Sequence, residues 1–582
     1  MNILTKLSNI VTAAFEQAGI DAKYAPVTVS NRPDLCQFQS NGCLLAAKEY
    51  KKNPLELAGQ VAQILAAEPC IEAAQAAPPG FVNIIVTGEF LAQNMQEMLN
   101  DDRLCVDKLP NPGKLVVDYG GPNIAKPLHV GHLRSAIIGQ SLKNLAAFLG
   151  HEVIGDIHMG DWGLQMGLVI AQIKTTQPGL NFFDDSFTGE YDKIDLTLEQ
   201  LNQIYPAASA RSKTDEEFRA LAMAITRDLQ NHKPGYFELW KQIVAVSIQD
   251  LKRNYKTLGV DFEVWYGESH ADPYIQPLIQ LLNDKKLTHL DEGALIVDIE
   301  QPDDQEPMPP VLISKSDGAQ LYATTDLATL MQRMKDYNPA QIWYVVDNRQ
   351  TLHFKQVFRC AQMAGIVDER VNLEYIGFGT MNGKDGKPYK TRDGGVMRLS
   401  DLIETIKNGA LEKISDETEA GLKQQIGEHV GIAALKFGDL SNHRTKDYVF
   451  DLDRFLAFEG KTGPYLQYTT VRINSVLQKA EQSETEFCKI TAPASEAETQ
   501  LMLKINKTEQ YLLRAYEERS LNGICECAYE IAAAFNRFYF ETKILSHQDV
   551  EQRASWLALL RLSRNTLALL LGVLGIEIPE RM

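Results

Sequence analysis

The sequence contains cysteines but lacks the spacings that would give them a structural role. Its eight cysteines include no C-x-x-C pair, which argues against a zinc ribbon. The closest two, Cys525 and Cys527, are predicted to share one helix, and no disulfide framework is visible. We therefore expect reduced thiols and a cytoplasmic protein.

Long apolar runs and one common nucleotide motif are also missing. The N-terminal stretch has no continuous apolar segment and carries Glu16 within its first predicted helix, so neither a signal peptide nor a membrane span is expected. No G-x-G-x-x-G follows any predicted strand. This argues against a dinucleotide-dependent dehydrogenase, which is the rival class of α/β enzyme.

Positive charge is scarce. The chain has 58 Lys and Arg against 76 Asp and Glu, a net charge of −18. Such an acidic chain is a poor non-specific binder of nucleic acid, because phosphate contacts need local positive charge. Any contact with RNA is therefore expected to be a localised basic strip.

The chain does have the length and composition for several domains. Its 582 residues, 45% of them apolar, predict three or four domains with ordinary packed cores. Residues 2–19, about Asn53–Ala67 and Glu89–Leu99 have helical periodicity, and Phe81–Val86 is typical of a strand. These predict a small α+β module that ends at a Pro/Gly-rich linker, Leu109–Gly113.

One segment combines a strand, a loop and a helix in a way that suits a phosphate-bearing ligand. The apolar run Leu115–Val117 predicts a buried strand, and a glycine-rich loop carrying Lys126 follows it. His129-Val130-Gly131-His132 then begins a predicted helix that ends at Gly150. In open α/β sheets this is where phosphates bind, since free backbone N–H groups and the helix dipole favour anions there.

Three interpretations of the two histidines compete. They could be incidental turn residues, since three fixed positions match by chance in a small share of chains. They could share a zinc ion, although a third ligand with recognisable spacing is missing. The third interpretation is that their imidazoles donate hydrogen bonds to ATP phosphates. Only this one uses the strand–loop–helix context.

The rest of the chain predicts a second half of the sheet and then helices. Residues 175–310 are expected to be an insertion, after which Val311–Ser314, Leu321–Asp326 and a helix to about Tyr337 resume the domain. The strand Ile342–Val346 is followed by Asp347–Gln350 at the ligand-facing edge. From about residue 400 onward the periodicity is almost entirely helical, which predicts a helical bundle.

Several motifs resemble the arginyl-tRNA synthetases of class I. GPNIAKPLHVGHLRS resembles their form of the HIGH motif, and further segments follow in the same order. These are HMGDWGLQMG (158–167), YATTDLA (322–328), GKDGKPYKTRDGG (383–395), FDLDRFLAFEGKTGPYLQY (450–468) and the terminal Glu580-Arg581-Met582. Since the resemblance covers most of the chain, we identify it as a member of that family.

The resemblance implies that arginine is activated by ATP and then transferred to the terminal ribose of a tRNA. His129 and His132 would stabilise the phosphoryl transition state, and Gly131 would let the nucleotide approach closely. His353 is a further candidate contact of ATP. Mg²⁺ would be held mainly by the ATP phosphates, so no tightly bound metal is expected.

One motif of the wider class is degenerate here. The KMSKS loop, whose second lysine steadies the phosphates, corresponds to Lys387–Arg392. Arginyl enzymes without that lysine have one just before the HIGH motif, which is the position of Lys126. The resemblance therefore gives Lys126 the phosphate-stabilising role, with Lys390 and Arg392 as helpers from the loop.

Recognition of arginine needs a carboxylate that can pair with the planar guanidinium. By resemblance, Asp326 is the first candidate for this role, although a helix N-cap before Leu327 is the structural alternative. The other matching positions are Asp118 and Asn123 for the α-amino end, and Tyr322 and Gln350 for the remaining polar contacts. For Asp118 the alternative is a strand-end turn acid.

Contacts with tRNA are predicted only loosely. In the family, the N-terminal extension touches the corner of the tRNA that carries the D-loop. In the helical region, aromatic and basic residues could stack unpaired anticodon bases, but aromatics at this spacing more often belong to a core. They are Arg454, Lys461, Tyr465, Tyr468, Arg472, Arg537, Phe538, Tyr539, Phe540 and Lys543.

These observations predict an α/β fold in three parts. A small N-terminal α+β domain (1–110) precedes a Rossmann-like parallel-sheet catalytic domain (113–400, with the insertion at about 175–310) and an all-α helical bundle (401–582). A monomer without membrane contact is the family expectation. Two rivals stay open, namely a related nucleotidyltransferase that adenylates a small acid without tRNA, and an inactive tRNA-binding relative.

Overall fold

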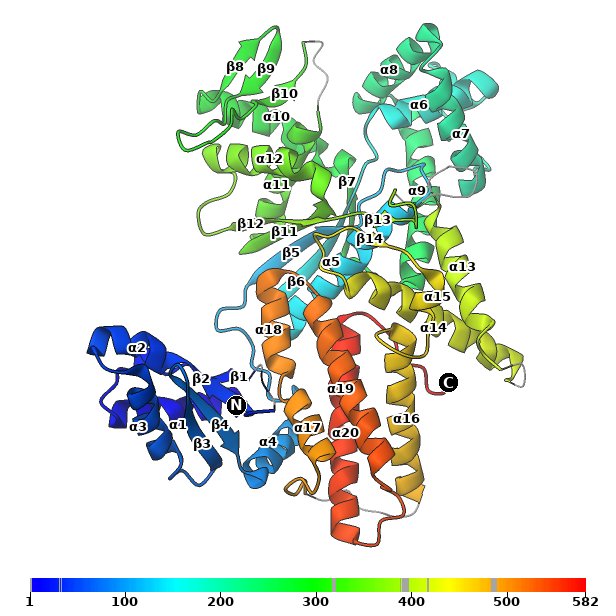
Figure 1. Ribbon diagram of the computed structural model, residues 1–582. Coiled ribbons are helices and arrows are strands. Elements are labelled where there is room, and N and C mark those ends of the chain that lie inside the picture. Colours follow the sequence, from blue (N-terminus) through cyan, green and yellow to red (C-terminus); the bar gives the residue numbers. More distant parts are fainter. Residues whose placement is uncertain are drawn as a thin grey trace. The chain divides into compact units, whose positions relative to one another are not determined.

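The computed structural model describes residues 3–30, 32, 34–316, 321–387, 389, 397–415, 418–482 and 489–582. It divides into two compact units (Figure 1). The first unit consists of Met1–Leu109, Ala457–Val573 and Glu577–Met582. The second consists of Pro110–Leu456 and Leu574–Ile576.

A five-stranded parallel sheet is the centre of the second unit. Its strand order is β12-β11-β5-β6-β7. The bounds are β5 Lys114–Tyr119, β6 Glu152–Met159, β7 Val264–Gly267, β11 Gln341–Asp347 and β12 Asn372–Phe378. The predicted strands at 115–117 and 342–346 are confirmed as the buried strands β5 and β11.

The order of these strands places the ligand site. The chain runs from β5 to β6 and β7 on one side, and later adds β11 and β12 on the other side of β5. The direction of winding therefore reverses between β5 and β11, and ligands of doubly wound sheets bind beyond the carboxyl ends of strands at such a point. The loop that follows β5 leads into α5, Val130–Phe148, and the loop that follows β11 leads into α12, Thr351–Met363.

Helices and a small second sheet complete this unit. The helices between β6 and β11 are α6 Leu164–Thr176, η2 Asn181–Phe183, α7 Leu198–Arg211, α8 Glu216–Gln230, α9 Pro234–Thr257, α10 Glu268–Asp284 and α11 Tyr322–Tyr337. Strands β8 Thr288–Asp291, β9 Ala294–Val297 and β10 Val311–Ser314 form an antiparallel sheet. Because β7 lies inside the region that we expected to be an insertion, that region also contributes a strand to the main sheet.

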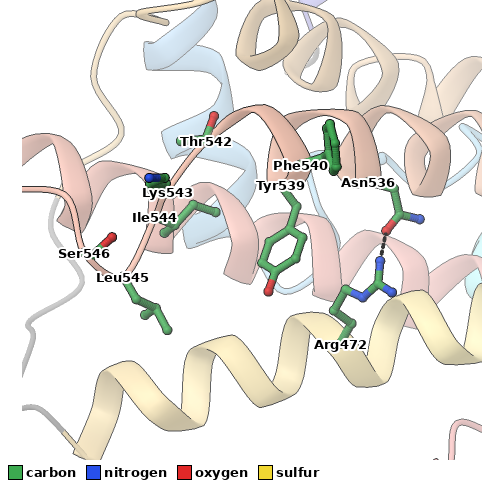
Figure 2. Close-up of a pocket in the computed structure, with 9 residues that line it drawn as sticks. All are labelled: Arg472, Asn536, Tyr539, Phe540, Thr542, Lys543, Ile544, Leu545 and Ser546. Carbon is green, nitrogen blue, oxygen red and sulfur yellow. Dashed lines mark hydrogen bonds between the residues drawn. The ribbon is translucent and has the colours of Figure 1, made fainter.

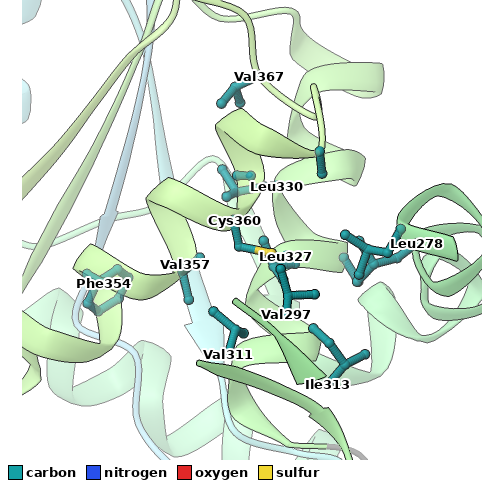
Figure 3. Packing of buried hydrophobic residues seen from close by; sticks show 14 of the residues in the cluster. Leu278, Val297, Val311, Ile313, Leu327, Leu330, Phe354, Val357, Cys360 and Val367 are labelled. Atoms are coloured by element: carbon teal, nitrogen blue, oxygen red, sulfur yellow. The ribbon is translucent and has the colours of Figure 1, made fainter. Parts of the chain in front are cut away.

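The main sheet, the small sheet and α10–α12 share one hydrophobic core. Leu278 of α10, Val297 of β9, Val311 of β10, Leu327 of α11 and Val357 of α12 are all buried in it (Figure 3). Helix α11 begins at Tyr322, so most of Leu321–Asp326, which we placed before the helix, forms its first turns. This core fixes the start of α11 against the edge of the parallel sheet.

The last part of the second unit is mostly helical. It contains η3 Asn348–Gln350, β13 Met381–Asn382, α13 Leu399–Leu411, α14 Ala420–Leu440, β14 Tyr448–Val449 and α15 Leu452–Phe455. Helix α14 packs on α13 and α5, and Arg134 of α5 forms a buried ion pair with Asp439 of α14 (3.0 Å). The second unit therefore includes helices beyond residue 400, where we placed the start of the C-terminal helical region.

The first unit begins with a small α+β module. Its sheet has the order β1-β2-β4-β3 and is antiparallel. The bounds are α1 Ile3–Gln17, η1 Ala22–Tyr24, β1 Thr28–Val29, β2 Phe38–Ser40, α2 Gly42–Tyr50, α3 Pro54–Leu65, β3 Ile71–Ala77, β4 Phe81–Val86 and α4 Gly88–Asn100. The predicted helices and the strand 81–86 are confirmed, whereas β1–β3 and α2 were not predicted.

The C-terminal helices of the first unit form a bundle on which α4 packs. They are α16 Gly463–Gln482, α17 Glu496–Ile505, α18 Thr508–Glu518, α19 Asn522–Glu541 and α20 Val550–Val573. As predicted, Cys525 and Cys527 share one helix, α19. Helix α20 is long and apolar enough to cross a membrane, but 67% of its most apolar window is buried inside the protein. Such burial is typical of the core helix of a bundle.

Candidate active site

A cavity of about 530 Å³ lies at the carboxyl ends of the parallel strands of the second unit. Its walls come from the segments that follow β5, β6, β7 and β11, and from the start of α11. The lining residues that carry polar side chains are Asp118, Asn123, His129, His132, Ser135, His158, Glu268, Tyr322, Asp326, Asp347, Arg349, Gln350 and His353. Gly131 also lines this cavity.

Backbone hydrogen bonds join the loop after β5 to the segment after β6. Ile124 N–H donates to the Gly160 carbonyl (2.9 Å), and Gly160 N–H donates to the Pro122 carbonyl (3.0 Å). A Cβ at Gly121 would lie only 2.3 Å from the His158 carbonyl oxygen, so this close approach of two chain segments requires glycine. The loop therefore reaches His129 in a fixed position.

The two histidines cap the helix that they begin. Nδ1 of His129 accepts a hydrogen bond from Gly131 N–H (3.1 Å), and Nδ1 of His132 accepts one from His129 N–H (3.1 Å). Val130 N–H donates to the Met397 carbonyl (3.1 Å). The first N–H groups of α5 are thus already bonded, so the expectation that they are free for phosphates is wrong.

The same bonds decide what the imidazoles can offer a ligand. Because each Nδ1 accepts a hydrogen bond, we assign each neutral ring its hydrogen on Nε2, which makes Nε2 a donor. Burial, with the neighbouring His129 as a smaller cause, lowers the pKa of His132 to about 3. Burial and then the charges of Lys126 and Arg349 lower the pKa of His129. Both rings are therefore neutral Nε2–H donors at neutral pH.

The structure shows a local reason for glycine at position 131, which is the space that the His129 ring needs. A Cβ at this position would lie 2.8 Å from Cε1 of His129 and 2.9 Å from its Nδ1. These distances are too short for a real side chain, so a residue with a Cβ would displace the capping imidazole. Gly131 makes room for His129, in addition to lining the cavity.

Another wall of the cavity, formed where α10 and α11 begin, is acidic. Asp326 lies in the first turns of α11 and its Oδ2 is 2.5 Å from Nε2 of His353. Nε2 of His158 lies 3.9 Å from Oδ1 of the same carboxylate. The N-cap residue of α11 is Leu321, so the alternative that Asp326 is an N-cap is excluded. Asp326 is a cavity residue whose carboxylate is oriented by its hydrogen bond with His353.

Glu268 is a second acid on this wall, which sequence reasoning missed. It begins α10 directly after β7, at the same edge of the sheet as the other lining residues. Burial raises the pKa of Glu268 to about 7, and the charges of Asp161 and Asp326 act in the same direction. Its position directly after the short strand β7 was the only sequence signal, and the assignment of 175–310 to an insertion concealed it.

Asp118 lines the cavity but is also part of a buried ion network. Nη2 of Arg333 lies 2.6 Å from Oδ2 of Asp118 and 2.7 Å from Oδ2 of Asp156. Burial raises the pKa of Asp118, and the charge of Arg333 opposes this shift. The network joins β5, β6 and α11, so Asp118 is more than a strand-end turn acid.

Of the three residues predicted to contact phosphate from outside the HIGH motif, only Lys126 is described by the structure. Lys126 is absent from the lining, and its ammonium lies 4.6 Å from the ring centroid of Tyr205 in α7. Lys390 and Arg392 lie outside the described residues. Among the described residues no group of three or more His, Cys, Asp and Glu could hold a metal ion.

Comparisons with known proteins agree over the whole chain. The family model described as "tRNA synthetases class I (R), catalytic domain" matches residues 94–452. The curated arginine–tRNA ligase of Agathobacter rectalis is 49% identical over the full length of both chains, and that of Alkaliphilus oremlandii is 48% identical, also over both full lengths. The chain belongs to the arginyl-tRNA synthetase family.

The other comparisons extend this membership to both ends of the chain. A model described as "Arginyl tRNA synthetase N terminal domain" matches residues 2–86, and one described as "DALR anticodon binding domain" matches 466–582. Solved arginyl-tRNA synthetases share the fold. That of Plasmodium falciparum has a TM-score of 0.81 at 24% identity and covers 100% of this chain and 99% of its own. That of Thermus thermophilus has a TM-score of 0.78 at 20% identity over 100% of both. These matches confirm the predicted family and fold class.

A second cavity of about 890 Å³ lies in the bundle of this arginyl-tRNA synthetase family member. It is lined by Arg472, Asn536, Tyr539, Phe540, Thr542, Lys543, Ile544, Leu545 and Ser546. Figure 2 shows Tyr539 of α19 pointing toward Arg472 of α16, whose guanidinium lies 5.7 Å from the Tyr539 ring centroid. Phe540 is 91% exposed, whereas Phe538 is buried in the core. The predicted aromatics thus divide between surface and core.

Proposed function

We propose that the chain activates L-arginine with ATP and transfers the arginyl group to the 3′-terminal ribose of a tRNA. A carboxylate oxygen of arginine attacks the α-phosphorus of ATP, and the bond to pyrophosphate breaks. A ribose hydroxyl then attacks the arginyl carbonyl, and AMP leaves. No covalent intermediate with the enzyme forms, so the protein contributes positioning and electrostatic stabilisation.

The polarity of the cavity in the second unit supports this proposal most strongly. One wall carries the Nε2–H groups of His129 and His132, which suit phosphate oxygens. The other wall carries the carboxylates of Asp326 and Glu268, which suit a guanidinium. One cavity with a donor side and an acidic side fits a triphosphate and an arginine side by side.

We assign roles to the lining residues from their side-chain chemistry and from the family resemblance. Asp326 and Glu268 pair with the guanidinium, and His353 orients Asp326 through their hydrogen bond. Asp118 and Asn123 receive the α-amino end of arginine, and Tyr322 and Gln350 supply the other polar contacts. A site of this kind rejects an amino acid without a guanidinium because its own buried carboxylates would stay unpaired.

Lys126 is the proposed phosphate-steadying lysine, and Mg²⁺ is proposed to bind the triphosphate rather than the protein. Magnesium prefers phosphate and carboxylate oxygens and keeps several waters, so the ATP phosphates would hold it. We also propose that the protein is cytoplasmic and that it is a monomer. Size-exclusion chromatography with light scattering would test the monomer by giving its molar mass.

Exchange of pyrophosphate into ATP tests the proposal. With arginine and tRNA present, the wild-type protein is expected to exchange pyrophosphate, and Lys126→Ala to do so about 10²–10³ times more slowly. The control is Lys335→Ala, which removes another lysine that contacts an aromatic ring, at the far end of α11. Lys126→Ala activity within a few-fold of the control would remove the assignment.

We further propose that the cavity in the bundle contacts unpaired bases of the anticodon. Exposed aromatic rings beside Arg472 and Lys543 supply stacking surfaces and local positive charge on an acidic protein. Arg472→Met is expected to weaken tRNA binding and to reduce its dependence on salt. Unchanged affinity and salt dependence would place the RNA contact elsewhere.

A further inference from the structure

The ammonium group of Lys126 rests on an aromatic ring from a distant part of the second unit. Its Nζ lies 4.6 Å from the ring centroid of Tyr205, which belongs to α7. This distance is within the range of a cation–π contact. Among the residues that the structure describes, no carboxylate forms an ion pair with Lys126, so the ring is its close electrostatic partner.

Hydrogen bonds fix the backbone beside Lys126, but they do not fix the direction of the lysine side chain. Ile124 N–H donates to Gly160 O (2.9 Å), Ala125 N–H donates to Ser247 Oγ (3.4 Å), and Ala125 has a left-handed φ of 60°. A lysine side chain has a flexible four-carbon stem with several rotamers. The position of the ammonium group therefore depends on what holds its end.

Lys126 and Tyr205 do not line the cavity, but each acts electrostatically on a residue that does. The charge of Lys126 contributes, after burial, to the lowered pKa of His129, so the ammonium lies close to the imidazole pair. Tyr205 contributes, after burial and the charge of Glu268, to the raised pKa of Tyr322, which lines the cavity. The pair Lys126–Tyr205 is therefore within electrostatic range of His129 and Tyr322, two residues that line the cavity.

We propose that Tyr205 is a positioning residue that holds the Lys126 ammonium at the rim of the cavity, beside His129 and His132. The ring reduces the number of rotamers that the lysine samples, so the charge is already near the place where the triphosphate binds. This inference rests on the proposed role of Lys126. Helix α7, far along the chain from the HIGH motif, then takes part in adenylation through one side chain.

The test compares Tyr205→Leu with Tyr205→Phe in the full-length protein and in the Lys126→Ala background. Pyrophosphate exchange is measured with arginine and tRNA present, while ATP and arginine are varied in turn. Tyr205→Leu is expected to lower kcat/KM for ATP about two- to fivefold, as loss of an exposed cation–π contact predicts. Tyr205→Phe, which keeps the ring, is expected to match the wild type, and KM for arginine to stay unchanged.

The double variant separates this role from a structural one. In the Lys126→Ala background, Tyr205→Leu is expected to have no further effect, because the group that it positions is absent. The same loss in both backgrounds, a raised KM for arginine, or an unaffected Tyr205→Leu protein would each overturn the inference. A fully active Lys126→Ala protein would overturn the role of Lys126 as well. Matching melting temperatures of the single variants exclude misfolding as the cause of a loss.

Discussion

At the scale of single residues, the two histidines act through hydrogen-bond geometry rather than charge. Each Nδ1 accepts a hydrogen bond that caps α5, which leaves the Nε2–H of each ring as its donor in the cavity. With a pKa of about 3, His132 is not a cation under ordinary conditions. The stabilisation of a phosphoryl transition state by this pair therefore rests on preorganised neutral donors in a partly buried site.

Glu268 gives the cavity a pH dependence near neutrality. Since burial raises its pKa to about 7, the unligated carboxyl group is protonated below that pH, and a guanidinium must displace the proton. We expect KM for arginine to rise as pH falls below about 7, by at most about tenfold per unit. Kinetics between pH 5.5 and 8.5 would measure this, with Glu268→Gln as the comparison.

The comparison is needed because other groups face Glu268, namely His158, Asp161 and Asp326. Glu268→Gln is expected to weaken arginine binding at pH 8 and to flatten the dependence of KM on pH.

The raised pKa of Glu268 also sets how its contribution to folding stability changes with pH. The contribution of Glu268 to the free energy of unfolding is fully present below about pH 4.5 and is lost as the pH rises through about 7. A Glu268→Gln protein with the wild-type profile would contradict the role.

At the scale of elements, Arg333 joins α11 to the strands β5 and β6 through two buried ion pairs. It is 1% exposed and is the one cation described between Asp118 and Asp156. Arg333→Met would leave two buried carboxylates without a counter-charge, which is expected to cost about 3–5 kcal/mol of unfolding free energy. Chemical denaturation followed by fluorescence would measure the loss.

The matched control for Arg333 is a surface pair of the same chemistry. Arg370 also pairs with an aspartate, Asp368, but the arginine side chain is 89% exposed. Arg370→Met is expected to leave the unfolding midpoint unchanged, because solvent screens such pairs. Equal effects of the two substitutions would show that the buried network does not hold α11 in place.

Elements were predictable where one periodicity dominates. β5 and β11 are short apolar runs, and α1 has a continuous apolar face, so local pattern was sufficient. Strand β3 was missed because its sequence, IEAAQAA, is rich in alanine and is made a strand by pairing with β4. The first turns of α11 were misplaced because Thr324 and Thr325 do not favour a helix by themselves. Thr324 is instead fixed by a hydrogen bond to Ile313.

The site was predictable only where family motifs carry it. His129, His132, Asp326 and Gln350 come from separate motifs and all line one cavity, while the roles that the resemblance gives them stay predictions. Glu268 and Tyr205 come from the region that we treated as an insertion, and only the folded chain brings Glu268 to the cavity and Tyr205 to Lys126. The capping role of the imidazoles could not be inferred either, because it depends on a ring rotamer and not on residue type.

At the scale of the whole molecule, the two ends of the chain share one unit. Helix α4 of the N-terminal module packs on α17 and α20, and Asn94 Nδ2–H donates to Asn506 Oδ1 (2.6 Å). Asn94 is fully buried. The two parts of the chain expected to touch tRNA are thus joined by a buried polar contact within a common packing interface.

This contact predicts that the module and the bundle stabilise each other. Asn94→Leu would leave Asn506 buried without its partner and is expected to destabilise the first unit by about 1–3 kcal/mol. Hydrogen exchange of α17 would report the change, with the exposed neighbour substitution Gln93→Ala as control. A double Asn94→Leu, Asn506→Leu variant is expected to recover part of the loss. Unchanged protection of α17 in Asn94→Leu would contradict the coupling.

The central claim is that one cavity holds the triphosphate against the imidazole pair and the guanidinium against the acidic wall. A crystal structure with arginine and a non-hydrolysable ATP analogue tests it most directly. We predict phosphate oxygens within hydrogen-bond distance of Nε2 of His129 and His132, and the guanidinium paired with Asp326 and Glu268. A triphosphate bound away from the two imidazoles, or a guanidinium away from both carboxylates, would contradict the account.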